Sequence, residues 1–124
     1  MKILNSTPHP INVIAGAEYN TATRKWVAGD GSVVVKTIEP SGTVLNAQFT
    51  TIDGEPIDGI PVYSRKVVGI DPLPTGYDIV IVSSVYALAA TAAQGIDTSA
   101  MYTIADPVTD GNGKIVGCRG LMKA

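Results

Sequence analysis

A strand that runs directly into a helix is the feature that most constrains this chain. The short β-branched run from Ile79 to Val82 favours a strand, and the alanine-rich stretch that follows favours a helix. Ser83 and Ser84 stand at the junction, where a helix cap is expected, and Gly95 stands where a left-handed cap would end the helix. The sequence therefore predicts a helix that begins at Ser84 and ends at Gln94.

The start of this predicted helix has two interpretations. The first backbone N–H groups of a helix lack partners, and their partial positive charge favours an anion such as phosphate. Tyr86 lies in the first turn, so an aromatic face would stand beside that phosphate, as a nucleotide-like ligand requires. Alternatively, Ser83 or Ser84 caps a core helix and Tyr86 packs inside it. The sequence leaves both interpretations open.

The rest of the chain is divided by turn signals into short apolar runs. Dipeptides such as Asp53-Gly54 and Asn112-Gly113 are typical of hairpin turns. Residues rich in β-branched side chains predict strands at 2–5, 11–15, 32–38, 44–52, 60–68, 79–82 and 114–118. A second, short helical turn is expected over Thr98 to Tyr102. These elements predict an α+β fold, a mainly antiparallel β-sheet with one or two short helices and a projecting hairpin arm.

Two segments carry more specific predictions within one domain that spans residues 1–124. The stretch from Glu18 to Gly31 ends in Gly-Asp-Gly and predicts the hairpin arm, with residues 17–31 as an insertion that projects from the body. The run from Ser32 to Ile38 is too uniformly apolar at its start to face water on one side. It predicts a buried central strand.

Charge and composition limit the class of partner. Charged residues make up 16% of the chain and the formal net charge is −2, so no basic field exists to attract nucleic acid. We expect no DNA partner. No run approaches the roughly 20 apolar residues of a membrane helix, and the first residues lack the pattern of a signal peptide. With a single cysteine, Cys118, these features predict a cytoplasmic protein with no membrane partner.

The inventory of catalytic side chains is small. His9, the only histidine, lies between two prolines and would have to serve as the base for Cys118 or Ser83 in any hydrolase. A buried, inert thiol is the preferred interpretation of Cys118. One histidine and one cysteine do not make a zinc site, and no loop matches a calcium or phosphate motif. We therefore expect no metal, no cofactor and binding without turnover, with a small hydrolase as an alternative.

Three cations complete the predicted ligand site. Arg65 lies on a predicted strand, and Lys114 and Arg119 bracket the last predicted strand. Arginine offers forked donors to phosphate. If these strands border Ser83 and Ser84, cations and free backbone amides would meet in one pocket.

Three motifs in order resemble a known family. They are Ile3-Leu-Asn-Ser-Thr-Pro-His-Pro-Ile11, Glu39-Pro-Ser-Gly-Thr43, and a later region with Val82-Ser-Ser84 and Asp110 to Leu121. Together they resemble small phage and prophage proteins with an N-terminal Leu-Asn-x-Thr-Pro-His signature. The resemblance spans most of the chain except residues 17–31. It extends to the Thoeris anti-defence family of phage sponges, which sequester cyclic ADP-ribose isomers.

The resemblance implies a homo-oligomer with pockets at its subunit interfaces. It implies an aromatic that stacks on adenine, for which Tyr86 is the match, arginines that hold the diphosphate, and cyclic oligonucleotides as further ligands. Two positions differ from the family pattern. Ser84 stands where the family pattern has an arginine. Ile96-Asp97 stands where it has an Arg-Asp pair, so only the aspartate of that pair is kept, as Asp97.

These arguments predict a non-enzymatic phage anti-defence protein that sequesters a cyclic ADP-ribose-type nucleotide. The predicted ligand-binding residues are Ser83, Ser84, Tyr86, Arg65, Asp97, Lys114 and Arg119. A phage structural or assembly protein is a further alternative, because many short strands, a projecting arm and low charge suit a self-associating subunit.

Overall fold

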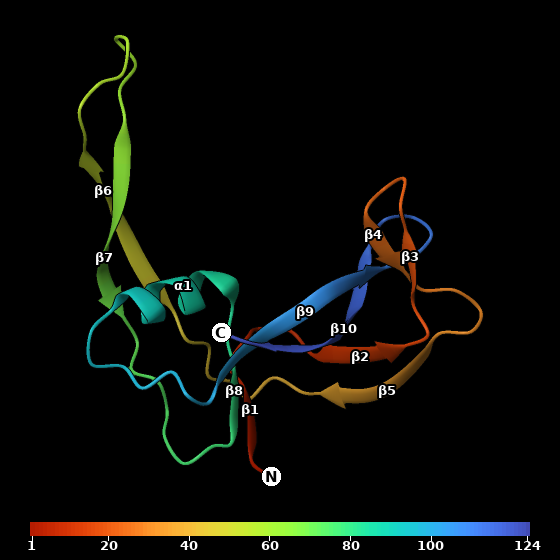
Figure 1. Ribbon diagram of the computed structural model, residues 1–124. Coiled ribbons are helices and arrows are strands. Elements are labelled where there is room, and N and C mark those ends of the chain that lie inside the picture. The colour runs from red at the N-terminus through yellow and green to blue at the C-terminus, as the bar shows by residue number, and fades with distance from the viewer.

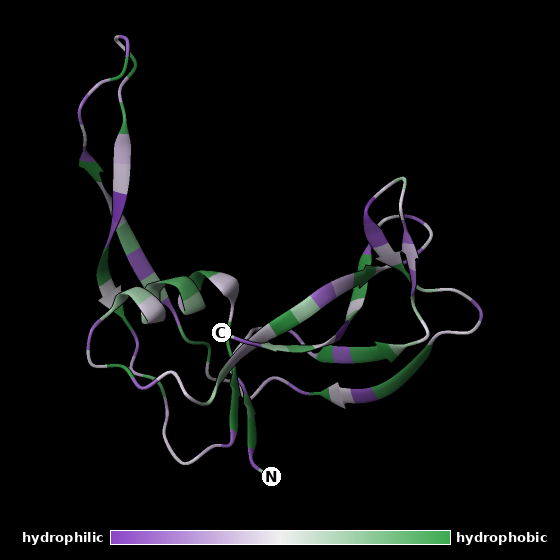
Figure 2. Ribbon diagram, viewed as in Figure 1, coloured by the Kyte–Doolittle hydropathy of each residue, from purple (hydrophilic) through white to green (hydrophobic).

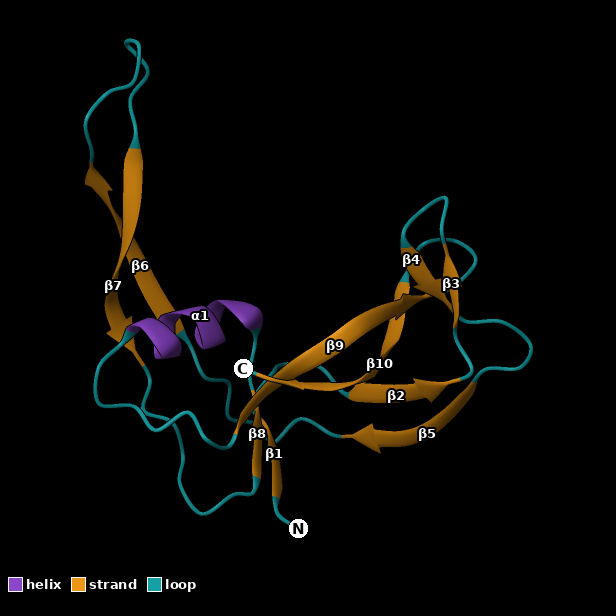
Figure 3. Cartoon of the chain, viewed as in Figure 1, coloured by secondary structure: helices purple, strands orange, loops and turns teal.

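The computed structural model describes residues 1–124 and is mainly β with one short helix (Figures 1 and 3). The helix is α1 (Ser84–Ala92). The strands are β1 (Ile3–Asn5), β2 (Ile11–Ala15), β3 (Glu18–Asn20), β4 (Lys25–Val27), β5 (Val33–Ile38), β6 (Ala47–Asp53), β7 (Tyr63–Ile70), β8 (Ile79–Ile81), β9 (Met101–Thr109) and β10 (Ile115–Lys123).

The main sheet is mixed and curls into a half-barrel. Its strand order is β1-β8-β9-β10-β2-β5, and the β3–β4 hairpin joins it through β4, which pairs with β9. The prediction of a mainly antiparallel sheet is wrong, because β1–β8, β8–β9, β10–β2 and β4–β9 are all parallel pairs. A separate antiparallel pair, β6–β7, forms the second sheet.

The strand-to-helix junction is the centre of a β-α-β unit. β8 leads into α1, and α1 returns the chain to β9, which pairs with β8 in parallel. The predicted helix is confirmed, although it ends two residues early, at Ala92. The second helical turn, expected over Thr98 to Tyr102, is present only as a single hydrogen-bonded turn. The N–H of Met101 donates to the carbonyl of Thr98 at 3.0 Å, and β9 begins at Met101, so no helix forms. The N–H of Val80 donates to the carbonyl of Ala100 at 2.8 Å, and pairing with β8 holds Met101 and Tyr102 extended.

A proline lies within β9 without breaking the sheet. Pro107 faces Cys118 of β10. On its other edge, β9 pairs with β8 at Met101 and Tyr102, and with β4 at Val108 and Thr109. Pro107 therefore falls between these two ladders, where its missing N–H removes no bond.

The core is small and lies on both faces of β8. Only 16 of 124 residues are buried. Val80 and Val82 point to one side, where they pack with Tyr86, Met101 and neighbouring residues under α1. Ile81 points to the other side and packs with Ile11 and Cys118. The alternation along β8 thus links the helix layer to the rest of the sheet.

The N-terminal signature motif forms a buried polar network. Asn5, 1% exposed, donates from Nδ2 to the carbonyls of His9 at 2.9 Å and Ile38 at 3.0 Å. Its Oδ1 accepts from the N–H and hydroxyl of Thr7. The hydroxyl of Ser6, also buried, donates to the carbonyl of Ile81 at 2.6 Å. These bonds tie the turn after β1 to β5 and β8, so the motif has a structural role.

The hairpin that projects from the body is not the predicted one. Residues 18–27 do form a hairpin, β3–β4, but β4 is joined to β9. The projecting arm is instead β6–β7, which extends away from the body with its tip at residues 54–62 (Figure 1). The predicted strands at 44–52 and 60–68 are its two sides.

β5 is an edge strand and not the buried central strand that its composition suggested. It pairs only with β2, at the end of the sheet order. Its first three residues, Val33, Val34 and Val35, are 52–61% exposed. The apolar character of this strand is therefore not explained by packing within the chain.

Candidate functional site

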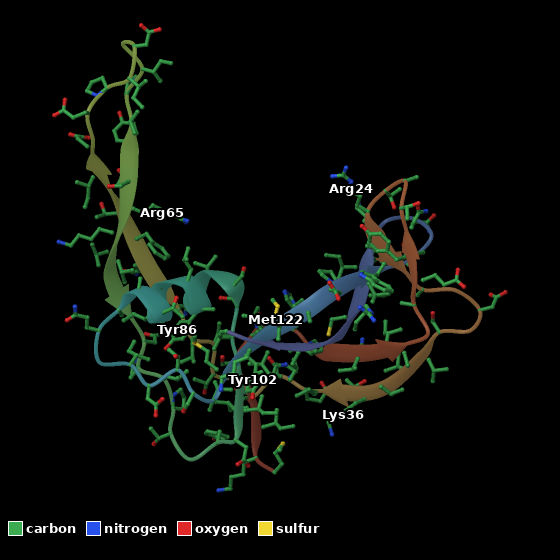
Figure 4. All side chains as sticks on the ribbon, viewed as in Figure 1. Arg24, Lys36, Arg65, Tyr86, Tyr102 and Met122 are labelled. Atoms are coloured by element: carbon green, nitrogen blue, oxygen red, sulfur yellow. The ribbon has the colours of Figure 1, made fainter.

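Tyr86 is a core side chain and is not available to stack on a ligand. It is fully buried in the cluster under α1, and its hydroxyl donates to the carbonyl of Asp71 at 2.6 Å (Figure 4). Burial, and then the negative charge of Asp71, raises the pKa of Tyr86. The interpretation in which Tyr86 simply packs is the one that its position supports.

Ser83 and Ser84 are exposed at the start of α1, and Ser83 is the N-cap. Its hydroxyl accepts a hydrogen bond from the N–H of Tyr86 at 3.2 Å. This bond already satisfies one of the free amides that were expected to receive a phosphate.

Arg119 and Lys114 lie at the other end of the sheet. Arg119 places its guanidinium 3.7 Å from the ring centroid of Trp26 on β4 and forms an ion pair with Asp106 at 3.0 Å. Lys114 lies in the turn between β9 and β10, where its backbone N–H donates to Asp110. The structure does not bring these two cations to the start of α1.

Asp97 lies in the exposed loop after α1. Its carboxylate accepts the backbone N–H of Ser99 at 3.0 Å. Hydrogen bonds from the backbone and then the side chain of Ser99 lower the pKa of Asp97. The side chain therefore closes a local turn.

The residues of the hydrolase alternative are placed in different environments. Cys118 is 1% exposed among apolar side chains, and burial raises the pKa of its thiol. His9 is exposed in the turn between β1 and β2. The hydroxyl of Ser83 is occupied as a helix cap. A nucleophile needs a lowered pKa or an adjacent base, and the environment of Cys118 has the opposite effect.

One predicted ligand residue, Arg65, lies in a groove. The groove runs between β7 of the arm and the C-terminal half of α1 and encloses about 770 Å³. Arg65 extends from the arm into the space above α1 (Figure 4). The apolar lining of the groove is formed by Val67, Val68, Ile70, Leu88, Ala92 and Ala93. The volume lies within the usual range for small-molecule sites, about 300–1,000 Å³.

Phe49 and Lys66 also border the groove, and the sequence analysis did not select them. The guanidinium of Arg65 lies 5.1 Å from the ring centroid of Phe49. The two cations have no carboxylate among the lining side chains. The sequence did contain a signal that could have identified Phe49. It is the only phenylalanine, and turn dipeptides lie between its strand and the strand of Arg65. A hairpin across residues 53–59 would have brought the two together.

A second depression has a different character. It encloses about 620 Å³ at the base of the β3–β4 hairpin and carries Glu18 and Asp30. These carboxylates would repel a phosphate.

No group of three or more His, Cys, Asp or Glu side chains is placed to hold a metal ion. No helix has the length and hydrophobicity to cross a bilayer.

Comparison with protein-family models, with curated proteins and with solved structures finds no match for this chain.

Proposed function

We propose that this chain is a non-enzymatic phage anti-defence protein that binds and sequesters a cyclic ADP-ribose-type nucleotide in the groove between β7 and α1. The observation that carries the proposal is the combination, in one groove, of Phe49 and Arg65 over an apolar floor. The phage context is supported by the resemblance of the three sequence motifs. The protein would act in the cytoplasm of the host cell, where such a signal is made.

The lining side chains suit the parts of such a ligand. Adenine would stack against Phe49 and the guanidinium of Arg65, since both offer flat surfaces. The diphosphate would lie toward Arg65, whereas Lys66, the next residue on β7, directs its side chain to the other face of the strand. The groove is bordered by the C-terminal half of α1, whose partial negative charge disfavours an anion there. The phosphates would therefore sit on the arm side and the uncharged part of the ligand against Leu88 and Ala92.

The same lining favours holding the ligand over altering it. Apart from Lys66, no side chain that could act as a nucleophile or general base borders the groove. A ligand bound there would meet hydrogen-bond donors and apolar surface. This is the arrangement expected for sequestration.

The test is a titration of the protein with cyclic ADP-ribose isomers by calorimetry, followed by heating and analysis of the released ligand. Phe49→Leu keeps an apolar side chain but removes the stacking surface, and it should weaken binding about 10- to 100-fold. Arg65→Gln should weaken it by at least a similar factor. Arg24→Gln, which removes a cation far from the groove, is the control and should bind as the parent does. Equal affinity for all four proteins, or an altered ligand on release, would contradict the proposal.

A phage structural or assembly subunit is the second candidate, favoured by the exposed area. The chain exposes 8163 Å², whereas a folded monomer of 12.9 kDa is expected to expose roughly 6,300 Å². Sedimentation velocity distinguishes the candidates. A species that keeps growing with concentration and binds no cyclic nucleotide would favour the structural role, whereas a closed oligomer that binds one would favour sequestration.

A further inference from the structure

We propose that the β6–β7 arm of one copy docks on the exposed edge strand β5 of a second copy, so that two chains exchange arms in a closed dimer. This inference concerns surfaces outside the ligand groove and does not depend on the proposed function. It accounts for two features that the single chain leaves unexplained, an apolar edge strand and a two-stranded ribbon that extends into solvent.

The first feature is the edge of β5. Val33, Val34 and Val35 are each more than half exposed, and they lie on both faces of the strand. The outer edge of β5 has no partner strand. An apolar edge with free backbone groups tends to pair with another chain. Figure 2 shows this hydrophobic start of β5 at the end of the molecule that is farthest from the arm.

The second feature is the arm. A two-stranded ribbon is marginally stable in water by itself, and most residues of β6 and β7 are exposed. Its tip presents Ile57 and Ile60, which are 66% and 62% exposed. Because the arm points away from the body (Figure 1), it cannot reach β5 of its own chain.

The two surfaces offer one pairing of opposite charges. From Asp53 to Val62 the tip carries Asp53, Glu55 and Asp58 and no lysine or arginine. Lys36 lies on β5, and the exposed carboxylates Asp30 and Glu39 flank the strand. Arg24, at the end of the β3–β4 hairpin, lies on the opposite side of this part of the molecule (Figure 4). A carboxylate of the acidic tip would pair with Lys36 of another copy, the one cation on β5.

The exposed area fits an obligate interface between copies. The excess over a folded monomer is about 1,900 Å², and large permanent interfaces take roughly 1,000–2,500 Å² from each partner. Both complementary surfaces belong to one chain, so a two-fold axis would satisfy both arms and both β5 edges at once. A second copy is therefore the occupant that these observations favour.

Chemical cross-linking between single-cysteine variants tests the contact directly. Val35→Cys and Ile57→Cys are prepared separately, mixed, allowed to exchange and treated with a short bis-maleimide. Cys118 is buried, so it should contribute little background. We expect a cross-linked dimer from the mixture and almost none from either variant alone. Cross-linking within one variant alone, or none in the mixture, would overturn the proposal.

A charge exchange provides a second measurement that does not rely on the cross-linker. Lys36→Glu and Glu55→Lys should each weaken the dimer several-fold in sedimentation equilibrium, since each places like charges at the contact. Together they should restore the parent affinity. If the double variant is weaker than either single variant, the arm does not meet β5.

Discussion

The layer around α1 and the β6–β7 arm adjoin each other, yet different interactions stabilise them. Under α1, Val80, Tyr86 and Met101 are completely buried, and the polar groups beside them are paired. Along the arm, most side chains face water and the only strand pairing is that between β6 and β7. The β3–β4 hairpin lies between these extremes, because one of its edges is joined to β9. Stability should therefore be concentrated in the layer around α1 and decrease toward the hairpins.

The largest expected effect comes from Tyr86, the biggest fully buried side chain. Tyr86→Ala should lower the free energy of unfolding by about 3–5 kcal/mol, because the cavity lies beneath α1 and cannot collapse easily. Tyr86→Phe keeps the ring but loses the hydrogen bond to Asp71, and it should cost about 1 kcal/mol. Urea unfolding measures both. A Tyr86→Ala variant as stable as the parent would mean that this side chain is not in the core.

The next effect tests the buried network of the N-terminal motif. Asn5→Ala would leave the carbonyls of His9 and Ile38 without their donor and should cost about 2–3 kcal/mol in the same measurement. Asn46→Ala is the matched control. Asn46 is exposed, so its loss should change stability by no more than about 0.5 kcal/mol. Equal effects at the two positions would show that the network is not structural.

A close backbone approach in the main sheet gives a smaller effect. A Cβ at Gly117 would lie 2.5 Å from the carbonyl oxygen of Asn12 and 2.6 Å from Cδ1 of Ile14. Gly117→Ala should therefore separate β10 from β2 and cost about 1–3 kcal/mol. Gly120 lies on the same strand with nothing within 4 Å of its Cβ position, so Gly120→Ala should be nearly neutral. If both variants lose the same stability, the effect comes from the strand and not from this contact.

Local elements could be predicted from this sequence, but their partners could not. The strand from Ile11 to Ala15 and the strand-to-helix junction were placed correctly, because propensity and caps act over a few residues. The parallel pairs join segments far apart in the chain, and no local pattern encodes them. The local signal at Thr98 to Tyr102 produced one hydrogen-bonded turn, and pairing with β8 made Met101 and Tyr102 the start of a strand.

The same limit explains the errors about the arm and the candidate site. Both hairpins have turn signals and alternating strands, and only the pairing of β4 with β9 determines which of them projects. Tyr86, the only aromatic in an alanine-rich helix, suits a ligand stack and a core equally well until the burial of α1 is known. Arg65 could be selected as a cation on a strand, but its neighbour Phe49 could be found only by pairing β6 with β7.

The smallest effect concerns the attachment of the β3–β4 hairpin. Arg119→Gln removes both the cation over Trp26 and the ion pair with Asp106. Both contacts are partly exposed, so the change should cost no more than about 1 kcal/mol. Trp26 is the only tryptophan, so its fluorescence reports on this hairpin alone. Its emission should shift toward that of exposed tryptophan while the urea midpoint changes little. Unchanged emission would mean that pairing with β9, without the arginine, is enough to hold the hairpin.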